Sequence, residues 1–350
     1  MANLNDLPAE MMELGVEKKK NGKNWNNLPD EMKEMVVKEM TIETRTRLKM
    51  CSKADKQLVE SIRMPFDKLN IKLCWDVLSV KLHSEKLQKP VLDLEIWTNY
   101  GTVKIKDLNK EECVERGAKI PNNEKHVKCS SIKKTKNLVR QMFASIVSSF
   151  RCDSVNAKID APDFDTNLEF TIKTNHINIR GSPSQVTGLL KNVAPGVKSV
   201  YLNTYRNEGL EDIGSISAVI NAKKLVVFCS NDINDEQLLK LNCTSLNLDF
   251  ESNITAKGIN QLIKKAIAND YPKGSKLVTY VDKNVMFQTW KDIIEGLDVE
   301  VTESEDVTLN DGQVKFEKRR GRIHMNHGKW MNLYQLDNGG LGLLKIEIHQ

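Results

Sequence analysis

Residues 25–62 read WNNLPDEMKEMVVKEMTIETRTRLKMCSKADKQLVESI, and this stretch has the most specific pattern in the chain. Pro29 suits the first position of a helix, because its ring fixes a helical φ and its missing N–H leaves no donor unpaired. Asp30 and Glu31 follow in the first turn, where the positive end of the helix dipole favours carboxylates. We therefore expect a helix that begins at Pro29.

The apolar residues of this helix recur at steps of three and four, which places them on one face. They are Met32, Met35, Val36 and Met40, and the helix is expected to end near Thr41. The face is rich in flexible thioether side chains. A helical stripe of this kind is more often part of a core than of an interface, so its context has to decide between the two.

Two further short helices are expected. One spans residues 43–50 and carries Leu48. Ser52, with Asp55 three residues later, resembles a capping box, so Ser52 is the expected N-cap of the next helix. That helix carries Leu58, Val59 and Ile62. Three helices in about forty residues bury little surface by themselves, and segments of this size need a partner or another domain.

The stretch resembles the F-box, the adaptor-binding motif of substrate receptors in cullin-RING ubiquitin ligases. An opening of the Trp-x-x-Leu-Pro type is followed by apolar positions and by an Arg-x-Arg-Leu-x-x-Cys-Ser-Lys run. The residues that match are Trp25, Leu28, Pro29, Val36, Val37, Met40, Arg45, Arg47, Leu48, Cys51, Ser52 and Lys53. The sequence departs from the pattern in carrying Met where F-boxes often have Leu or Ile, a replacement of similar volume.

This resemblance implies a non-catalytic substrate receptor that docks on an SKP-type adaptor and, through it, on a cullin. The target would be another protein, bound by the rest of the chain. No catalytic residue, cofactor or metal is implied. The candidate adaptor contacts are Trp25, Leu28, Pro29, Met32, Val36, Met40, Leu48, Cys51 and Leu58, some of which are expected to hold the helices together instead.

The composition is that of a soluble globular protein, with 40% hydrophobic and 28% charged residues among 350. The net charge of +5 is too small for this length to argue for nucleic acid by itself. No apolar run of membrane-spanning length and no secretory signal is present, so we expect a cytoplasmic or nuclear protein without membrane contact. The seven scattered cysteines are expected to be free thiols, mostly buried.

Beyond residue 64 the pattern changes to the period of two that is typical of half-buried strands. Alternation runs through Leu69, Ile71, Leu73 and Trp75, then Leu92, Leu94 and Ile96, then Val103 and Ile105. Residues 109–135 have no clear period and are expected to be mostly loop. Helical spacing returns over residues 138–150, which predicts a buried helix.

Residues 151–300 alternate short strand-like runs with helical segments. Most of the strand-like runs are 21 to 25 residues apart, and one step is longer. A strand plus a helix at this period is typical of stacked leucine-rich-repeat-like units. The consensus is ragged, and an irregular α/β fold without true repeats is the alternative. The expected fold class is thus α+β or α/β, with a short all-helical F-box followed by a strand-helix array.

This array also resembles the FTH-type domain that follows the F-box in the large nematode F-box families. The residues that carry the likeness are Leu189, Leu190, Ala194, Pro195, Gly196, Val200–Leu202, Ala222–Leu225, Leu246–Leu248, Ile254 and Thr255. The expected organisation is a tail (1–24), the F-box-like helices (25–64), a strand-rich segment with a buried helix (65–150), the FTH-type region (151–300) and terminal strands that cap the sheet (301–350).

The common catalytic motifs are missing from the sequence. It has no phosphate-binding loop, no Gly-x-Ser-x-Gly elbow and no His-Glu-x-x-His. Cys113, His126 and Cys129, or His324 and His327, could offer metal ligands, but their spacings fit no compact zinc module. A ubiquitin-transferring cysteine would need an activated thiolate, and Cys51 falls on the presumed docking helices instead.

Two basic clusters remain. The first comprises Lys125, Lys128, Lys133, Lys134, Lys136 and Arg140, and the second comprises Lys315, Lys318, Arg319, Arg320 and Arg322. The second follows an acidic run at residues 300–306, so cross-strand pairing is expected there. Neither is accompanied in the sequence by the aromatic platform typical of single-strand binding. The alternative to a ligase receptor is a scaffold that binds protein or RNA outside any ligase, and an enzyme comes third.

Overall fold

The structure is a computed structural model. It describes residues 25–40, 44, 48, 51–61, 64–74, 77–83, 92–99, 102–107, 124–128, 141, 150–161, 164, 171–205, 208–250, 252–282, 290–308, 314–338 and 341–350. The expected tail at residues 1–24 lies outside this range. The chain forms two compact units, of which the first comprises residues 1–65 and 149–151 and the second residues 66–148 and 152–350. The domain boundaries expected from the sequence stay predictions.

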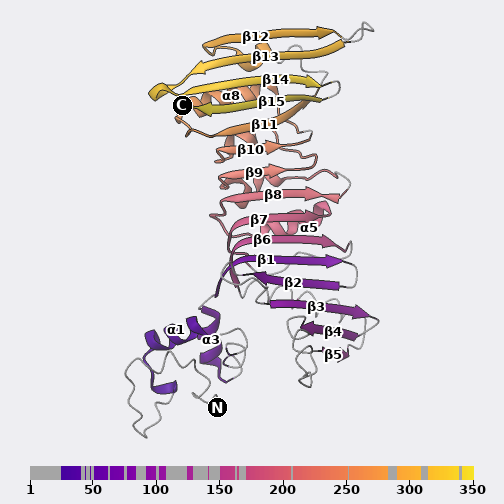
Figure 1. Cartoon of the computed structure of the whole chain (residues 1–350), viewed down its shortest axis with the longest axis vertical. Helices are drawn as coiled ribbons and strands as arrows, with labels where there is room; N and C mark the ends of the chain where they lie inside the picture. Colours follow the sequence, from indigo (N-terminus) through magenta and orange to yellow (C-terminus); the bar gives the residue numbers. More distant parts are fainter. Residues whose placement is uncertain are drawn as a thin grey trace, which may run out of the picture. The chain divides into compact units, whose positions relative to one another are not determined.

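Residues 25–61 of the first unit are mainly helical where they are described (Figure 1). It contains the 3-10 helix η3 (Trp25–Asn27) and the α-helices α1 (Asp30–Glu39) and α3 (Lys53–Ser61). The helix expected from Pro29 therefore exists, with Pro29 as its N-cap and Met40 as its C-cap. Thr44 and Leu48 are helical, while the other residues of the helix expected over 43–50 lie outside the described ones.

The second unit is built on one mixed sheet (Figure 1), with the strand order β12-β13-β14-β15-β11-β10-β9-β8-β7-β6-β1-β2-β3-β4-β5. The strands are β1 (Met64–Cys74), β2 (Val77–His83), β3 (Leu92–Asn99), β4 (Thr102–Asp107), β5 (Glu124–Lys128), β6 (Phe150–Asp160), β7 (Thr174–Gly181), β8 (Ser199–Thr204), β9 (Lys224–Val227), β10 (Ser245–Leu248), β11 (Lys276–Asp282), β12 (Val299–Thr308), β13 (Val314–His324), β14 (Trp330–Asn338) and β15 (Leu341–His349).

Parallel pairing runs through the middle of this sheet, from β6 to β11. Antiparallel strands extend it on both sides, β1–β5 on one and β12–β15 on the other. The register aligns aliphatic side chains into continuous rows across the parallel strands. One such row contains Val155, Ile177, Val200, Leu225, Leu246 and Leu277, all of which are buried.

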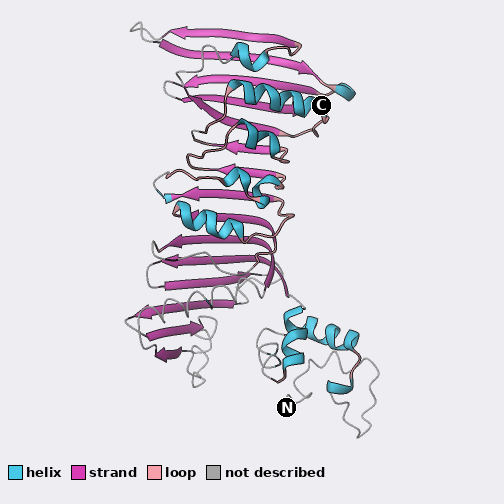
Figure 2. Ribbon diagram, turned by 180° about the vertical axis from the view of Figure 1, so that it is seen from behind, coloured by secondary structure: helices cyan, strands magenta, loops and turns pink. Residues whose placement is uncertain are grey.

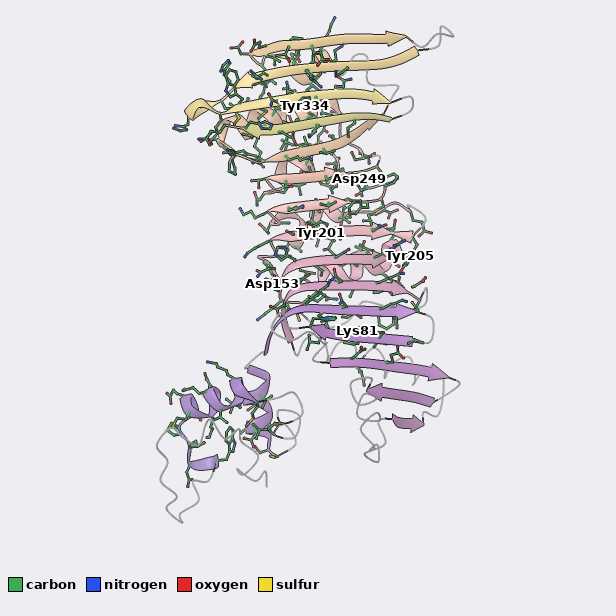
Figure 3. The ribbon with its side chains drawn as sticks, viewed as in Figure 1. Lys81, Asp153, Tyr201, Tyr205, Asp249 and Tyr334 are labelled. Atoms are coloured by element: carbon green, nitrogen blue, oxygen red, sulfur yellow. The ribbon has the colours of Figure 1, made fainter. Side chains whose placement is uncertain are left out.

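The described helices α5 to α8 cover these rows from one side (Figure 2). Figure 2 shows α5 (Pro183–Lys191), α6 (Ser217–Ile220), α7 (Asp235–Lys240) and α8 (Ala256–Ala268) on the same face of the sheet. α5 places Leu189 and Leu190 in the core, and α8 contributes Ile259 and Ile263. The strand side chains that alternate with the buried rows point to the opposite face, which Figure 3 shows with Lys81, Tyr201 and Tyr334 labelled. We call it the open face.

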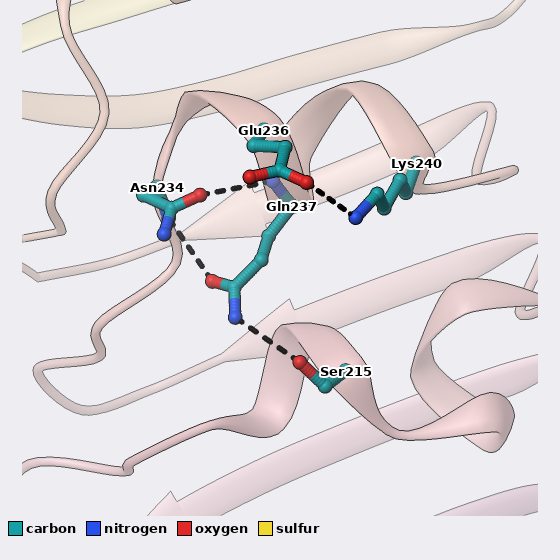
Figure 4. Close-up of polar contacts among 5 residues, drawn as sticks. All are labelled: Ser215, Asn234, Glu236, Gln237 and Lys240. Atoms are coloured by element: carbon teal, nitrogen blue, oxygen red, sulfur yellow. Dashed lines mark hydrogen bonds and ion pairs between the residues drawn. The ribbon is translucent and has the colours of Figure 1, made fainter.

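Polar side chains join successive strand-helix units. Asn234 caps α7 by accepting a hydrogen bond from Gln237 N at 3.0 Å, and Gln237 Oε1 accepts one from Asn234 N at 3.2 Å. Gln237 Nε2 then donates to Ser215 Oγ of the preceding unit at 3.4 Å (Figure 4). In the next unit Thr255 N donates to Asp235 Oδ1 at 2.8 Å. The units are therefore tied together at their turns as well as through the sheet.

Most of the expected strands are present, but three expectations are corrected. Residues 124–128 form β5 inside the stretch expected to be loop, because they pair with β4 although their own pattern is weak. Phe150 begins β6 instead of ending a helix. Among the helical segments expected within residues 151–300, the one over the apolar run at 210–220 is reduced to the single turns η6 (Ile213–Ser215) and α6. Of the helix expected over 138–150, only Gln141 is described as helical.

The junction between α7 and α8 gives a test of this packing. A Cβ at Gly258 would overlap the Asp235 carboxylate, whereas a Cβ at Gly209 would lie 3.9 Å from its nearest neighbour, Ser230 O. Gly258→Ala should lower the free energy of unfolding in urea by about 1 to 3 kcal/mol, as overpacked sites do. Gly209→Ala is the matched control and should change it by less than about 0.5 kcal/mol. Equal stability of the two variants would contradict this packing.

Candidate docking site

The described helices of the first unit share a cluster of buried apolar side chains. The cluster consists of Val37 of α1, Leu48, and Val59 of α3, which are 0%, 5% and 4% exposed. Trp25, Met40 and Leu58 are partly buried against this cluster. Each of these buried side chains contributes about 1.5 to 3 kcal/mol when fully buried.

A hydrogen-bond network fixes the start of this unit against α3. Trp25 Nε1 donates to Asp55 Oδ1 at 2.6 Å, and Ser52 Oγ donates to Asp55 Oδ2 at 2.7 Å. Asp55 N in turn donates to Ser52 Oγ at 3.0 Å, so the N-cap expected at Ser52 is present. Asp55 is only 9% exposed. Because a buried carboxylate must have its acceptors filled, this network holds η3 and α3 in a fixed relation.

The apolar face of α1 is wider than the buried cluster that it covers. At about 100° per residue, Val37 lies about 140° around the helix from Met32, and Met35 lies about 60° to the other side. Val37 is fully buried, while Met32 and Met35 are 48% and 65% exposed. Val36 and Met40, between these extremes, are partly buried. One edge of the stripe therefore packs in the unit and the other edge faces outward.

The nine predicted contact residues fall into three groups. Pro29, Met32 and Cys51 are exposed, and Leu28 and Val36 are half-buried. Trp25, Met40 and Leu58 pack against the buried cluster, and Leu48 lies within it. The last four hold the helices together in this structure, as expected for part of the set. Leu28 and Pro29 lie at the N-terminal end of α1, and Met32 and Val36 follow along its apolar face.

Two residues that matter here were not among the predicted contacts. Met35 is the most exposed large hydrophobic side chain of the described residues. Its position in the stripe was visible in the sequence, but which edge of the stripe would remain uncovered was not. Asp55 was expected only as part of a cap, and its bond to Trp25, thirty residues away, has no local signal.

Comparison with known families supports the resemblance in this region. Residues 25–67 match the F-box domain. No curated protein and no solved structure matches the chain. The chain thus carries an F-box domain, and such domains are typical of non-catalytic substrate receptors that bind an SKP-type adaptor in SKP-cullin-F-box ubiquitin ligases. The match indicates this general role and says nothing of the target.

The other candidate sites from the sequence have structural roles where they are described. The His324 ring packs on Trp330, with ring centroids 3.5 Å apart, and His327 Nε2 lies 3.9 Å from Asp270 Oδ2. Cys113 and Cys129 lie outside the described residues. Within the described part of the chain, no group of three or more potential ligands could hold a metal ion, and no helix is long and apolar enough to cross a membrane.

The second basic cluster is paired, as expected, with the acidic run on the neighbouring strand. Lys318 Nζ and Arg320 Nη1 lie 2.5 and 2.9 Å from the Glu303 carboxylate. Hydrogen bonding from Lys318 is the largest cause that holds the pKa of Glu303 below its usual value. Of the first cluster, Lys125 and Lys128 lie on β5, and the others are outside the described residues.

Aromatic rings lie beside two arginines of the second cluster, a contact that the sequence did not predict. The guanidinium of Arg320 lies 5.5 Å from the ring centroid of Tyr334, and that of Arg322 lies 4.8 Å from the ring centroid of Trp330. The rings belong to β14, which pairs with β13. Because this contact joins two strands, the local sequence around the arginines does not predict it. The guanidinium groups lie over the ring faces as cation–π contacts within the sheet. The covered faces are therefore not free to stack on a base.

Removal of the Asp55 carboxylate should loosen the first unit. Asp55→Ala leaves Trp25 Nε1 and Ser52 Oγ without their acceptor, at a cost of about 1 to 3 kcal/mol. Amide exchange over residues 53–61, measured by mass spectrometry, should become about tenfold faster or more. Asp30→Ala is the control, since Asp30 is an 88% exposed residue paired with Lys33 at 3.3 Å, and surface pairs of this kind contribute little. Unchanged exchange in Asp55→Ala would contradict the network.

Thiol reactivity should follow burial. Burial raises the pKa of Cys152 to about 12, with a smaller contribution from Asp67, and raises that of Cys243 to about 11. Burial also raises the pKa of Cys229. A raised pKa leaves little thiolate at neutral pH, so these thiols should be alkylated by iodoacetamide only after unfolding, whereas the exposed Cys51 should react in the native protein. Rapid native labelling of Cys152 or Cys243, detected by peptide mass spectrometry, would contradict this assignment.

Proposed function

We propose that the protein is the substrate-recognition subunit of an SKP-cullin-F-box ubiquitin ligase, acting in the cytoplasm or nucleus. The first unit docks on the SKP-type adaptor, which connects it to the cullin, and the sheet unit holds the target protein. Ubiquitin transfer is carried out by other subunits. The observation that supports this function most strongly is the outward apolar edge of α1 within a region that matches the F-box domain.

The docking surface in this proposal is formed by Leu28, Pro29, Met32, Met35 and Val36. They lie at the N-terminus and along one edge of α1, and three of them are exposed. Trp25, Met40, Leu48 and Leu58 support this surface from behind by packing in the buried cluster. Met side chains suit such a role, because their flexible thioethers adapt to the shape of a partner.

We further propose that residues 151–300 are an FTH-type region of the nematode F-box type, with leucine-rich-repeat-like stacking. Three bridges outside the main strands support the stacking, since they join residues 21, 21 and 19 apart in parallel: Ile172 with Val193, Leu210 with Asn231, and Asn234 with Asn253. The quoted residues of the resemblance fall on the strands and helices of these units, and Val200, Leu225 and Leu246 take equivalent places in the register of β8, β9 and β10. Leu189 and Leu190 lie on α5, Val200–Leu202 on β8, Leu246–Leu248 on β10, and Thr255 caps α8.

A charge at the outward edge of α1 tests the docking surface. Met32→Lys with Met35→Lys should reduce co-purification of the SKP-type adaptor at least tenfold, because burial of one Met side chain is worth about 1.5 to 3 kcal/mol and tenfold in affinity corresponds to about 1.4 kcal/mol. The matched control is Glu34→Lys, which changes the net charge equally at an exposed position of the same helix.

A second pair of substitutions addresses the N-terminal part of the surface. The double variant Leu28→Ala, Pro29→Ala should also lose the adaptor while circular dichroism stays unchanged. Equal recovery of adaptor by both double variants and by the unaltered protein would overturn the proposed function.

A further inference from the structure

The open face of the sheet contains a hollow of about 470 Å³. It lies over β1, β2, β6, β7 and β8 and is lined almost entirely by polar and basic side chains. We call it the basic hollow. Its residues are Asn70, Ile71, Lys72, Ser79, Lys81, Asn156, Ala157, Lys158, Asn178, Arg180, Asn203 and Phe228. They come from parts of the sequence up to 158 residues apart and meet through the register of the strands.

Cations dominate the charge of the basic hollow. Lys158 of β6 stands opposite Arg180 of β7 in the parallel ladder, and both are exposed, as is Lys72 of β1. Among the described residues, no carboxylate forms an ion pair with these three. Lys81 is already paired, since its Nζ lies 2.9 Å from Asp93 Oδ2. Three cations that line one hollow, without an ion-paired carboxylate among the described residues, attract an anionic group from outside.

An acidic residue, Asp160, lies on the same strand as Lys158. Asp160 follows Lys158 on the same face of β6 and is half-buried near Tyr205, where its charge contributes to the raised pKa of the tyrosine after desolvation by burial. The guanidinium of Arg180 lies 5.3 Å from the Tyr205 ring centroid, which holds Arg180 in place. Arg180 is therefore positioned by a ring at one edge while it remains exposed to solvent.

Amide side chains form the floor between these cations. Asn156 stands opposite Asn178 in the ladder, and Asn156 Nδ2 donates to Asn70 Oδ1 at 3.0 Å. Asn203 of β8 stands opposite Arg180. Each amide offers both a donor and an acceptor, which matches the alternating N–H and C=O groups of an extended peptide. A polynucleotide backbone, by contrast, offers almost only acceptors to such a floor.

Three apolar residues line the basic hollow, of which Ile71 and Ala157 are buried and Phe228 is exposed. Phe228 follows β9 and is 37% exposed, one of four large hydrophobic side chains exposed among the described residues. A single partly exposed ring can hold one apolar side chain, whereas binding of single-stranded RNA uses a series of rings on which successive bases stack. The lining thus combines four cations, of which Lys81 is paired with Asp93, several amides and one exposed apolar side chain.

We propose that the basic hollow binds an extended acidic segment of the target protein, with Asp or Glu side chains at Lys158 and Arg180 and an apolar side chain at Phe228. This inference rests on the proposed function, because it assigns the class of target that the receptor holds. The carboxylates pair with the two cations, and the amide floor hydrogen-bonds the backbone of the segment. Phe228 fixes the register by covering the apolar side chain.

Selection from a random peptide library displayed on phage tests the inference with the full chain as bait. Peptides recovered on the unaltered protein should be enriched in Asp and Glu beside an apolar residue. A fluorescent copy of the most enriched peptide should bind at least tenfold more weakly to the double variant Lys158→Glu, Arg180→Glu. The matched control is Lys191→Glu, Lys257→Glu, which makes the same charge change at exposed positions of α5 and α8 and should bind the peptide as the unaltered protein does.

Three outcomes would overturn the inference. They are no enrichment of acidic peptides, equal binding by the two double variants, and displacement of the peptide by a ten-nucleotide uridine RNA that itself binds more tightly. Thermal unfolding monitored by circular dichroism confirms that the double variant is folded. The selection does not involve the adaptor, and both double variants should still co-purify with it. If the unaltered protein did not bind the adaptor, the proposed function would be refuted, while the peptide-binding result for the basic hollow would still stand.

Discussion

Burial of the strands from one side is the constraint on which the sheet unit depends. Each parallel strand presents aliphatic side chains to α5, α6, α7 or α8, and the register aligns them into rows that no single strand-helix unit could bury. The other side chains of the same strands must then be compatible with water. This requirement explains why the open face carries asparagine, lysine and arginine, and why a polar hollow of useful size can exist there without loss of the core.

In the helical unit, by contrast, apolar side chains are left outside the buried cluster. Among the described residues, its buried cluster of Val37, Leu48 and Val59 packs under one edge of the apolar face of α1, while Met32 and Met35 on the other edge are exposed. Exposed thioethers on a rigid helix suit an interface, because their burial against a partner adds free energy that the isolated unit lacks. The hydrogen bond from Trp25 to Asp55 helps to hold the helices of this unit together while Met32 and Met35 remain exposed.

Local sequence patterns predicted the elements better than the surfaces. The spacing of the strand-like runs predicted β6 to β11, and the steps of three and four predicted α1, because both patterns reflect residues that are neighbours in the chain. β5 was missed since its pairing with β4 outweighs its weak local pattern. The strand at Phe150 was missed because an apolar residue at the end of a helical run fits either element.

The surfaces depend on contacts between distant residues. No pattern reveals that Lys158 would stand beside Arg180, that Trp330 would meet Arg322, or that Val37 would take the buried side of α1. The F-box resemblance could be read from ordered residues, but which of them face outward required the packing of the three helices.

The most direct test of the central claim is hydrogen exchange of the full chain with and without the SKP-type adaptor. The account predicts strong protection of residues 25–40 and none in the sheet. Unchanged exchange over α1, with protection elsewhere, would contradict it.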